Sequence, residues 1–217
     1  MSTTQKIIEN KVFLWHPKNY SNPKTRDSWM GVRNGMVILD PETVASQIET
    51  AKSMFADAKK SNKQVLVICE KEMFKQELEE LGEKQWFHYM NHKIPAWVLT
   101  NFDTLLSRIT SLQTMRTFVT SQQFDSLTKK EQSMKKRQLA KIEKVYKWVV
   151  NLRKKPDLVI IIDGQMMHKF VEEIEILNIP AIVLASTNFD MYTDCHLVHC
   201  NVNNTTSIRY VLEEITS

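Results

Sequence analysis

Short runs of consecutive apolar residues recur along the chain and predict buried β-strands. The six runs lie at residues 35–40, 64–69, 85–90, 157–163, 181–186 and 196–200. Most of them are apolar throughout rather than alternating between apolar and polar positions. Such strands are typical of a parallel sheet that is covered on both faces.

Segments with helical periodicity separate these strands. The first covers residues 41–60 and begins after Asp40, whose carboxylate is expected to cap it, with a proline at its first position. Further helices are expected at residues 70–82, with Gly82 as the C-cap, and at residues 164–180 and 204–215. Strands that alternate with helices predict an α/β fold with a doubly wound parallel sheet.

The pattern changes after the third strand, where two long helical stretches follow each other at residues 102–119 and 128–155. Each has a narrow apolar stripe, formed by Leu105, Ile109, Leu112 and Met115 in the first and by Met134, Leu139, Ile142, Val145 and Val149 in the second. The two helices could pack on the sheet or pair with each other as a projecting hairpin. A helix that covers a core usually has a wider apolar face, so we favour a projecting hairpin packed as a coiled coil.

The distribution of charged residues also sets the helical hairpin apart from the rest of the chain. Residues 103–155 hold thirteen basic and four acidic side chains, whereas residues 156–217 hold two basic and nine acidic ones. Residues 1–102 are nearly neutral, with fourteen basic and twelve acidic side chains. We therefore expect an α/β domain formed by residues 1–102 and 156–217, with a basic helical hairpin inserted at residues 103–155. Asymmetry of this kind favours a polyanion as partner.

Several classes of protein are disfavoured by composition. The four glycines have neither the spacing of a dinucleotide-binding fingerprint nor that of a P-loop, so no nucleotide cofactor is expected. Three cysteines form no disulfide framework and fit a reducing compartment. The sequence shows neither a signal peptide nor an apolar run long enough for a membrane span, which predicts a cytoplasmic protein that is not bound to a membrane.

The tetrapeptide Thr-Asn-Phe-Asp occurs twice, at residues 100–103 and 187–190. The first copy precedes a long helix, which Thr100 or Asn101 is placed to cap. The second copy follows a strand and leads into a loop. Because the flanking sequences do not align at a fixed period, we interpret the two copies as loop chemistry rather than as a duplication.

Six stretches together resemble one family, the bacterial-type ribosomal protein S2 of the small subunit. Asn-Pro-Lys at residues 22–24 and Arg-Asn-Gly-Met-Val-Ile-Leu-Asp at residues 33–40 are similar to two family segments at the same separation. The other four are Leu-Thr-Asn-Phe-Asp-Thr at residues 99–104, Leu-Thr-Lys-Lys-Glu at 127–131, Lys-Pro-Asp at 155–157, and Ile-Pro at 179–180 leading to Thr-Asn at 187–188. The matches are in order and cover nearly the whole chain.

The resemblance implies a flavodoxin-like sheet, a projecting helical hairpin between its third and fourth strands, and binding to small-subunit ribosomal RNA. This chain departs from the family pattern at several places. The two glycines before Leu-Thr-Asn-Phe are Ala96 and Trp97 here, and of the family's Gly-Thr-Lys after the second strand only Lys71 is kept. These departures bear on individual RNA contacts and are typical of a divergent bacterial or organellar member.

Strand-end residues suggest an alternative, an enzyme or a receiver domain that uses Asp40, Asp163 or Cys69. Asp40 is already explained as a helix cap, and a buried thiol explains Cys69. The segment Cys-His-Leu-Val-His-Cys at residues 195–200 carries four potential metal ligands. On a strand they would point to opposite faces in pairs, so we expect no metal site.

The candidate RNA contacts are polar and cationic side chains on predicted loops and on the hairpin. They are Asn22, Lys24, Arg33, Lys71, Asn91, His92, Lys93, Asn101, Arg108, Arg116, Lys129, Lys130, Lys135, Lys136, Arg137, Lys141, Lys144 and Lys147. The tryptophans Trp29, Trp86 and Trp97 could stack on unpaired bases. The prediction rests on the cluster, because a single lysine on a helix is usually a solvated surface residue.

Our first hypothesis is a structural constituent of the small ribosomal subunit without catalytic activity. Its partners would be small-subunit rRNA and neighbouring ribosomal proteins, with no cofactor, no metal and no stand-alone homo-oligomer. Besides the enzyme or receiver, a third hypothesis is an adaptor whose hairpin binds a protein.

Overall fold

The structure is a computed structural model that describes residues 3–85, 87–94, 97–190 and 193–217. Trp86 and Ala96, both singled out from the sequence, lie outside the described residues. None of the helices within the described ranges is long and apolar enough to cross a membrane.

A five-stranded parallel sheet forms the body of the molecule. Its strands are β4 (Val65–Ile68), β5 (His88–Met90), β6 (Leu158–Ile162), β7 (Ala181–Ala185) and β8 (His196–His199). They pair in the order β5-β4-β6-β7-β8. Counted along the chain, this is the order 2-1-3-4-5 of flavodoxin-like folds, and the strand order reverses between β4 and β6. The predicted flavodoxin-like α/β fold is confirmed.

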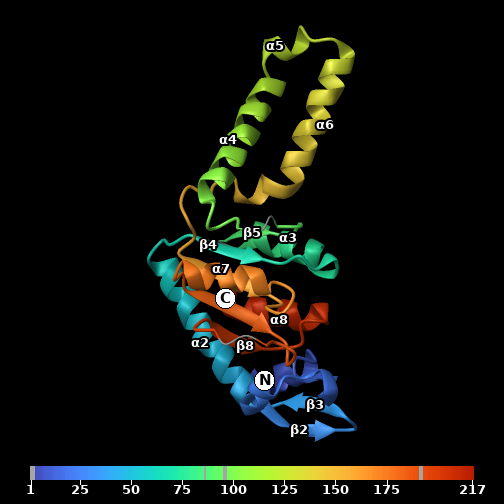
Figure 1. The fold of residues 1–217 in the computed structure, drawn as a ribbon, viewed down its shortest axis with the longest axis vertical. Coiled ribbons are helices and arrows are strands. Elements are labelled where there is room, and N and C mark those ends of the chain that lie inside the picture. The colour runs from blue at the N-terminus through green and yellow to red at the C-terminus, as the bar shows by residue number, and fades with distance from the viewer. Residues whose placement is uncertain (1–2, 86, 95–96, 191–192) are drawn as a thin grey trace.

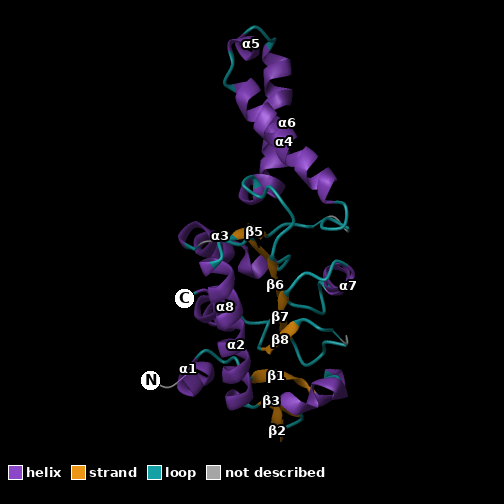
Figure 2. Cartoon of the chain, turned by 90° about the vertical axis from the view of Figure 1, so that its left-hand side faces the viewer, coloured by secondary structure: helices purple, strands orange, loops and turns teal. Residues whose placement is uncertain are grey.

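Helices cover both faces of this sheet, as the sequence pattern predicted. On one face lie α2 (Pro41–Lys60), α3 (Lys75–Lys84) and α8 (Thr205–Thr216), with α1 (Thr3–Glu9) beside α2 (Figure 2). On the other lie α7 (His168–Ile176) and the first turns of α4. Side chains alternate between the two cores: Val67 and Ile160 face the first, whereas Leu66 and Val159 face the second.

The strand predicted at residues 35–40 forms, but its assignment to the parallel sheet was wrong. It is β3 (Met36–Leu39), the central strand of a separate antiparallel sheet with β1 (Leu14–Pro17) and β2 (Trp29–Arg33). Arg33 pairs with Met36, so Asn34 and Gly35 form a two-residue hairpin turn with φ of 52° and 78°. Asn-Gly is the preferred sequence of such a turn, a local signal that the strand-helix alternation obscured.

The prediction that Gly82 ends a helix was also wrong. Helix α3 continues through Gly82 to Lys84. A Cβ on Gly82 would lie 2.1 Å from a ring carbon of Tyr89, which is almost fully buried. The glycine is therefore required by close packing between α3 and β5. Helix α7 likewise begins only at His168, so its predicted start at residue 164 was too early.

The hairpin extends away from the sheet beyond β5 (Figure 1). It consists of α4 (Phe102–Val119), the short α5 (Gln122–Asp125) and α6 (Lys129–Tyr146), followed by the 3-10 turn η4 (Lys147–Val149). Met134, predicted to lie in the apolar stripe of α6, is 52% exposed. Coiled-coil packing between α4 and α6 stays a prediction.

Candidate nucleic-acid interface

The hairpin is held together by a few specific contacts. Arg116 on α4 pairs through Nε with Glu143 on α6, at 2.7 Å. At the far end Phe124 is buried, and its ring meets that of Phe118 edge-on, with 6.1 Å between centroids. The side-chain amide of Gln132 donates to two backbone carbonyls of the connecting turn. These contacts fix the second helix against the first although α6 contains no fully buried residue.

The start of α6 is defined by local hydrogen bonds. Thr128 and Glu131 form a capping box, in which each side chain bonds the backbone N–H of the other residue. The Thr128 hydroxyl also donates to the Glu131 carboxylate, at 2.7 Å, and this bond, together with that from the Thr128 backbone N–H, lowers the pKa of Glu131. Of the two hairpin carboxylates described so far, one caps α6 and the other pairs with Arg116.

The remaining hairpin cations face solvent. Seven candidate contacts on α6 are exposed and, within the described residues, form no ion pair: Lys129, Lys130, Lys135, Lys136, Arg137, Lys141 and Lys144. Lys136 Nζ lies 5.6 Å from the centroid of the Phe124 ring, a cation–π contact that orients its stem. Lys147, in the turn after α6, is exposed as well. Because exposed cations raise the local positive potential, we expect this arm to attract polyanions.

The base of the hairpin is part of the body. Phe102, Leu105 and Ile109 on α4 are buried in the core that faces α7, together with Val149 and Leu152 after α6. Asn101 is the N-cap residue of α4, and its Oδ1 accepts from the Thr104 hydroxyl at 2.9 Å. The cationic arm is thus carried on a rigid root.

Asn22 and Lys24 are used within the fold. Both side chains donate to the Asp190 carboxylate, Lys24 Nζ at 2.9 Å. The backbone N–H of Asn22 donates to the Thr187 carbonyl at 2.6 Å. The second Thr-Asn-Phe-Asp copy therefore anchors the N-terminal Asn-Pro-Lys loop, whereas the first copy begins α4.

Two other candidates at the edge of the sheet are also engaged. Lys71 Nζ lies 2.6 Å from Asp163 and 2.9 Å from Asn203 Oδ1, and only 12% of its side chain is exposed. Asn91 is buried and donates to Glu79 and to the Lys75 carbonyl. A neutralised, largely buried ammonium group adds little to the field that a phosphate would meet.

The predicted RNA contacts lie in two separate parts of the molecule. Arg33 lies on β2, at the end of the molecule opposite the hairpin (Figure 1). His92 and Lys93 lie near the hairpin base, where burial and the charges of Lys75 and Lys144 lower the pKa of His92. Arg108 on α4 is exposed. The cations of the hairpin and of its base are thus close to one another, and the residues of the N-terminal sheet are not part of this group.

The strand-end residues of the enzyme hypothesis have structural roles. Asp40 accepts from the backbone N–H groups of Glu42 and Thr43, which confirms it as the cap of α2. Burial raises the pKa of Cys69 to about 11, so its thiol is protonated and a poor nucleophile at neutral pH. Asp163 is paired with Lys71.

The segment from Cys195 to Cys200 splits between the two faces of the sheet. Cys200 is buried in the core beneath α2 and α8, whereas Cys195 packs toward α7. His196 Nε2 lies 2.8 Å from the Gln47 carbonyl, and His199 is bonded to Ser28 and Gln47. Across the described ranges, no three metal-ligating side chains converge.

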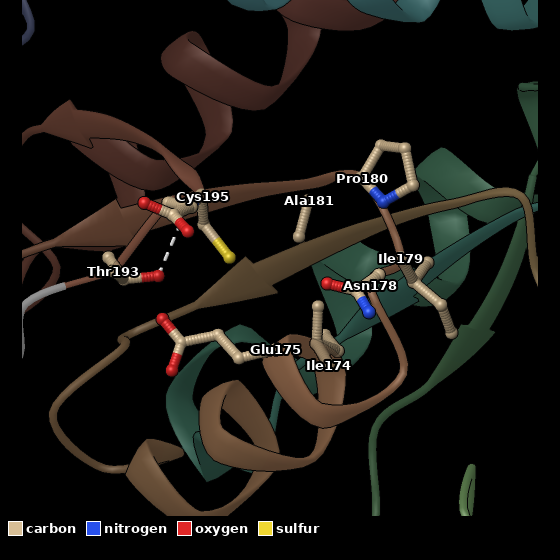
Figure 3. Close-up of a pocket in the computed structure, with 9 residues that line it drawn as sticks. Ile174, Glu175, Asn178, Ile179, Pro180, Ala181, Thr193 and Cys195 are labelled. Carbon is tan, nitrogen blue, oxygen red and sulfur yellow. Dashed lines mark hydrogen bonds between the residues drawn. The ribbon is translucent and has the colours of Figure 1, made fainter.

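A pocket of about 580 Å³ lies beside Cys195 (Figure 3). Glu175 and Asp194 line it, and burial together with these carboxylates raises the pKa of the Cys195 thiol. Two carboxylates in the lining would repel a phosphate, so we do not expect this pocket to contact RNA.

Tyr146 was not among the candidate RNA contacts predicted from the sequence. With Trp97, Asn101 and Arg108 it lines a cavity of about 170 Å³ at the root of the hairpin. No local pattern could have shown this, since these residues lie in separate segments. Trp29, in contrast, is half-buried and donates through Nε1 to Thr25.

Strand order, two covered sheet faces and a cationic helical arm define the class, a flavodoxin-like α/β protein with an inserted hairpin. The family described as Ribosomal protein S2 matches residues 7–217, and the chain belongs to that family. Each of the following relatives is named small ribosomal subunit protein uS2. The protein of Protochlamydia amoebophila is 30% identical over 96% of this chain and 76% of its own length. That of Picosynechococcus is 28% identical over 96% and 82%, and that of Coprothermobacter proteolyticus 29% over 87% and 70%.

One departure from the family pattern has a structural counterpart. Trp97 stands where the family has the second of two glycines, and its φ of 64° lies in the left-handed region that favours glycine. The backbone geometry expected of a glycine is thus kept with a bulky side chain attached.

Proposed function

We propose that this protein is a structural component of the small ribosomal subunit that binds small-subunit rRNA through its cationic hairpin. The observation that carries the proposal is the row of exposed cations on α6, which form no ion pair with any described residue and are held by a root that is buried in the body. Membership of the ribosomal protein S2 family supports the ribosomal role, and the names of its relatives place those proteins in the small subunit.

The physical basis is phosphate neutralisation. Lysine and arginine side chains that contact phosphates release condensed counterions, so affinity falls as salt rises, with a log–log slope of about −0.7 to −0.9 per phosphate. The seven exposed cations of α6 can act in this way at little cost, because they are already solvated and, among the described residues, form no ion pair that would have to be broken. Neighbouring ribosomal proteins would contact the surfaces left outside the RNA.

No catalytic role is proposed, because the candidate groups are engaged elsewhere. Asp40 caps α2, Asp163 pairs with Lys71, and Cys69 is buried as a thiol.

The first test is to change Lys135, Lys136, Arg137 and Lys141 together to Gln. All four side chains are exposed, so the fold should keep its stability within about 0.5 kcal/mol per change. We expect weaker binding to small-subunit rRNA and a salt slope flatter by about three units, allowing for one side chain that contacts no phosphate. Filter binding across a salt series measures both quantities.

A matched control also removes four cations, by changing Lys52, Lys59, Lys60 and Lys63 to Gln. The first three lie in α2, and Lys63 lies just beyond its end. This variant should bind with the wild-type slope. An unchanged slope in the hairpin variant, with normal co-sedimentation with small subunits, would refute the role of the hairpin. A wild-type protein that does not co-sediment with small subunits, and stays at the top of the sedimentation gradient, would refute the ribosomal role itself.

A further inference from the structure

Trp97 displays an exposed indole from a strained backbone, in the loop between β5 and α4. Its φ is +64°, where a Cβ crowds the following carbonyl, and its side chain is 59% exposed. Both the left-handed backbone and the contact of the ring with water cost free energy in the unliganded protein. Strained residues of this kind persist only where surrounding structure fixes them, and they cluster at ligand-binding sites.

The surroundings do fix this loop. The carbonyl of Trp97 accepts from the backbone N–H of Asn101 at 2.9 Å. Val98 and Leu99 are buried immediately after it, and the backbone N–H of Thr100 donates to the buried Glu173 carboxylate on α7. The indole is therefore held in place by the fold before any ligand binds.

Trp97 forms one wall of the 170 Å³ cavity at the hairpin root. The buried side chains of Val98 and Leu105 supply an apolar floor, and Tyr146 at the end of α6 contributes a second aromatic ring. Two rings from separate segments and an apolar floor are the elements from which proteins build stacking sites for bases.

Polar groups line the rest of the cavity. Asn101 Oδ1 is occupied by the Thr104 hydroxyl, which leaves the Asn101 amide nitrogen to donate; in the described part of the chain it has no acceptor. Arg108 is exposed and, unlike Arg116, forms no ion pair among the described residues. None of the described residues that line this cavity is acidic. A phosphate at the Arg108 side of the cavity would therefore meet a cation, whereas the carboxylates of Glu70, Glu172 and Glu173 line a second pocket that shares Trp97.

We propose that this cavity binds one unpaired RNA base, stacked on Trp97. Arg108 contacts an adjacent phosphate, and the Asn101 amide donates to an acceptor on the base or to a ribose oxygen. The inference rests on the proposed function and deepens it. The arm supplies affinity that depends on charge, whereas the cavity selects single-stranded RNA at the root of the hairpin.

The test uses the full chain, with a short single-stranded oligoadenylate as the probe and fluorescence anisotropy as the readout. Trp97→Gly removes the ring and also relieves the left-handed strain, so its thermal midpoint should be equal or higher. We expect its affinity to fall about 5- to 150-fold, the loss typical of one stacked base. The salt slope should stay unchanged, because no charge is removed.

Three further variants make the result specific. Trp97→Phe retains a ring and should keep most of the affinity. Tyr20→Ala removes another exposed ring, 73% exposed and located in the N-terminal lobe, and should bind as the wild type does. Arg108→Gln should flatten the salt slope by about one unit.

Any of three results would overturn the proposed base-binding site. Trp97→Gly could bind with wild-type affinity, Trp97→Phe could lose as much affinity as Trp97→Gly, or Tyr20→Ala could lose as much affinity as Trp97→Gly. Tighter binding of the same oligoadenylate in a duplex would also overturn it. If Trp97→Gly binds normally and still co-sediments with small subunits, only the cavity proposal fails. A wild-type protein that binds no RNA refutes the cavity and the proposed function together.

Discussion

His199, at the end of β8, shows how a single buried residue links the fold to pH. Its Nδ1 is 3.1 Å from both the Ser28 hydroxyl and the Gln47 side-chain nitrogen. Because the Gln47 amide oxygen accepts the backbone N–H of His199, the atom facing Nδ1 is the amide nitrogen, which can only donate; Nδ1 must therefore accept, and the ring proton is on Nε2. Nε2 is buried and has no partner among the described residues. The imidazole of this β8 residue is thus held neutral beside α2.

Burial lowers the pKa of His199 from its ordinary value of 6.5 to about 4. The unfolded chain therefore binds more protons between these two values, and stability rises with pH in this window. The stabilisation is complete above about pH 6.5 and is lost as the pH falls toward 4, amounting to about 3 kcal/mol.

We expect the difference in unfolding free energy between wild type and His199→Asn to shrink as the pH falls from 7.5 to 4.5. Urea titrations at several pH values measure this difference, which removes the contribution of the other titrating groups. A difference that does not change with pH would show that the pKa of His199 is the same in the folded and the unfolded protein.

At the scale of the element, the hairpin consists of two zones with different roles. The root contains Leu105, Ile109, Val149 and Leu152, all buried in the core that faces α7. In the distal arm Leu112 and Phe124 are buried as well, and neither belongs to the two cores of the body. The inserted unit was expected to span residues 103–155, and we propose that only its distal part is separable from the body.

Replacing residues 111–143 with a flexible Gly-Ser linker should leave a cooperatively folded α/β protein, because the root residues remain. Removing residues 103–155 should abolish cooperative unfolding. Each of the four lost apolar side chains contributes about 2–5 kcal/mol, and the sum reaches the whole stability of a typical domain. Thermal unfolding followed by circular dichroism compares the two deletions. A cooperative transition in the larger deletion would show that the root is dispensable.

At the scale of the whole molecule, charge is segregated along an elongated shape. The cationic arm extends from one edge of the sheet, and the acidic side chains of residues 156–217 lie on the body (Figure 1). Glu173 is an exception in this lobe, since it is buried and accepts the backbone N–H of Thr100. Exposed carboxylates close to phosphates would cost free energy, so the acidic side of the body is expected to face away from RNA.

Changing Glu175 to Gln and Asp194 to Asn, two carboxylates that line the pocket beside Cys195, should therefore leave both the rRNA affinity and the salt slope at their wild-type values. Glu173 is left unchanged, because its replacement would disturb the loop that leads into α4. Filter binding under the conditions used for the hairpin variant provides the comparison. Tighter binding of the double variant would show that these carboxylates lie near phosphates in the complex.

The sequence by itself determined the parallel sheet, its two covered faces and the position of the hairpin. The physical reason is that these features are periodic and local: uninterrupted apolar strands such as residues 158–162 have to be buried on both sides. Capping at Asp40 was equally readable, because a cap lies within three residues of the amides it bonds. The cationic character of α6 also follows from composition alone.

Only the tertiary structure decided which polar groups remain available for a partner. Lys71 and Lys24 look like the hairpin lysines in sequence, but carboxylates more than ninety positions away neutralise them. The sequence placed Gly82 at a helix end, because periodicity cannot show that this glycine packs against Tyr89 of a neighbouring strand. The cavity of Trp97, Arg108 and Tyr146 likewise joins three segments. Local sequence patterns follow backbone geometry over a few residues, whereas pairing and packing between distant residues are settled only when the chain folds.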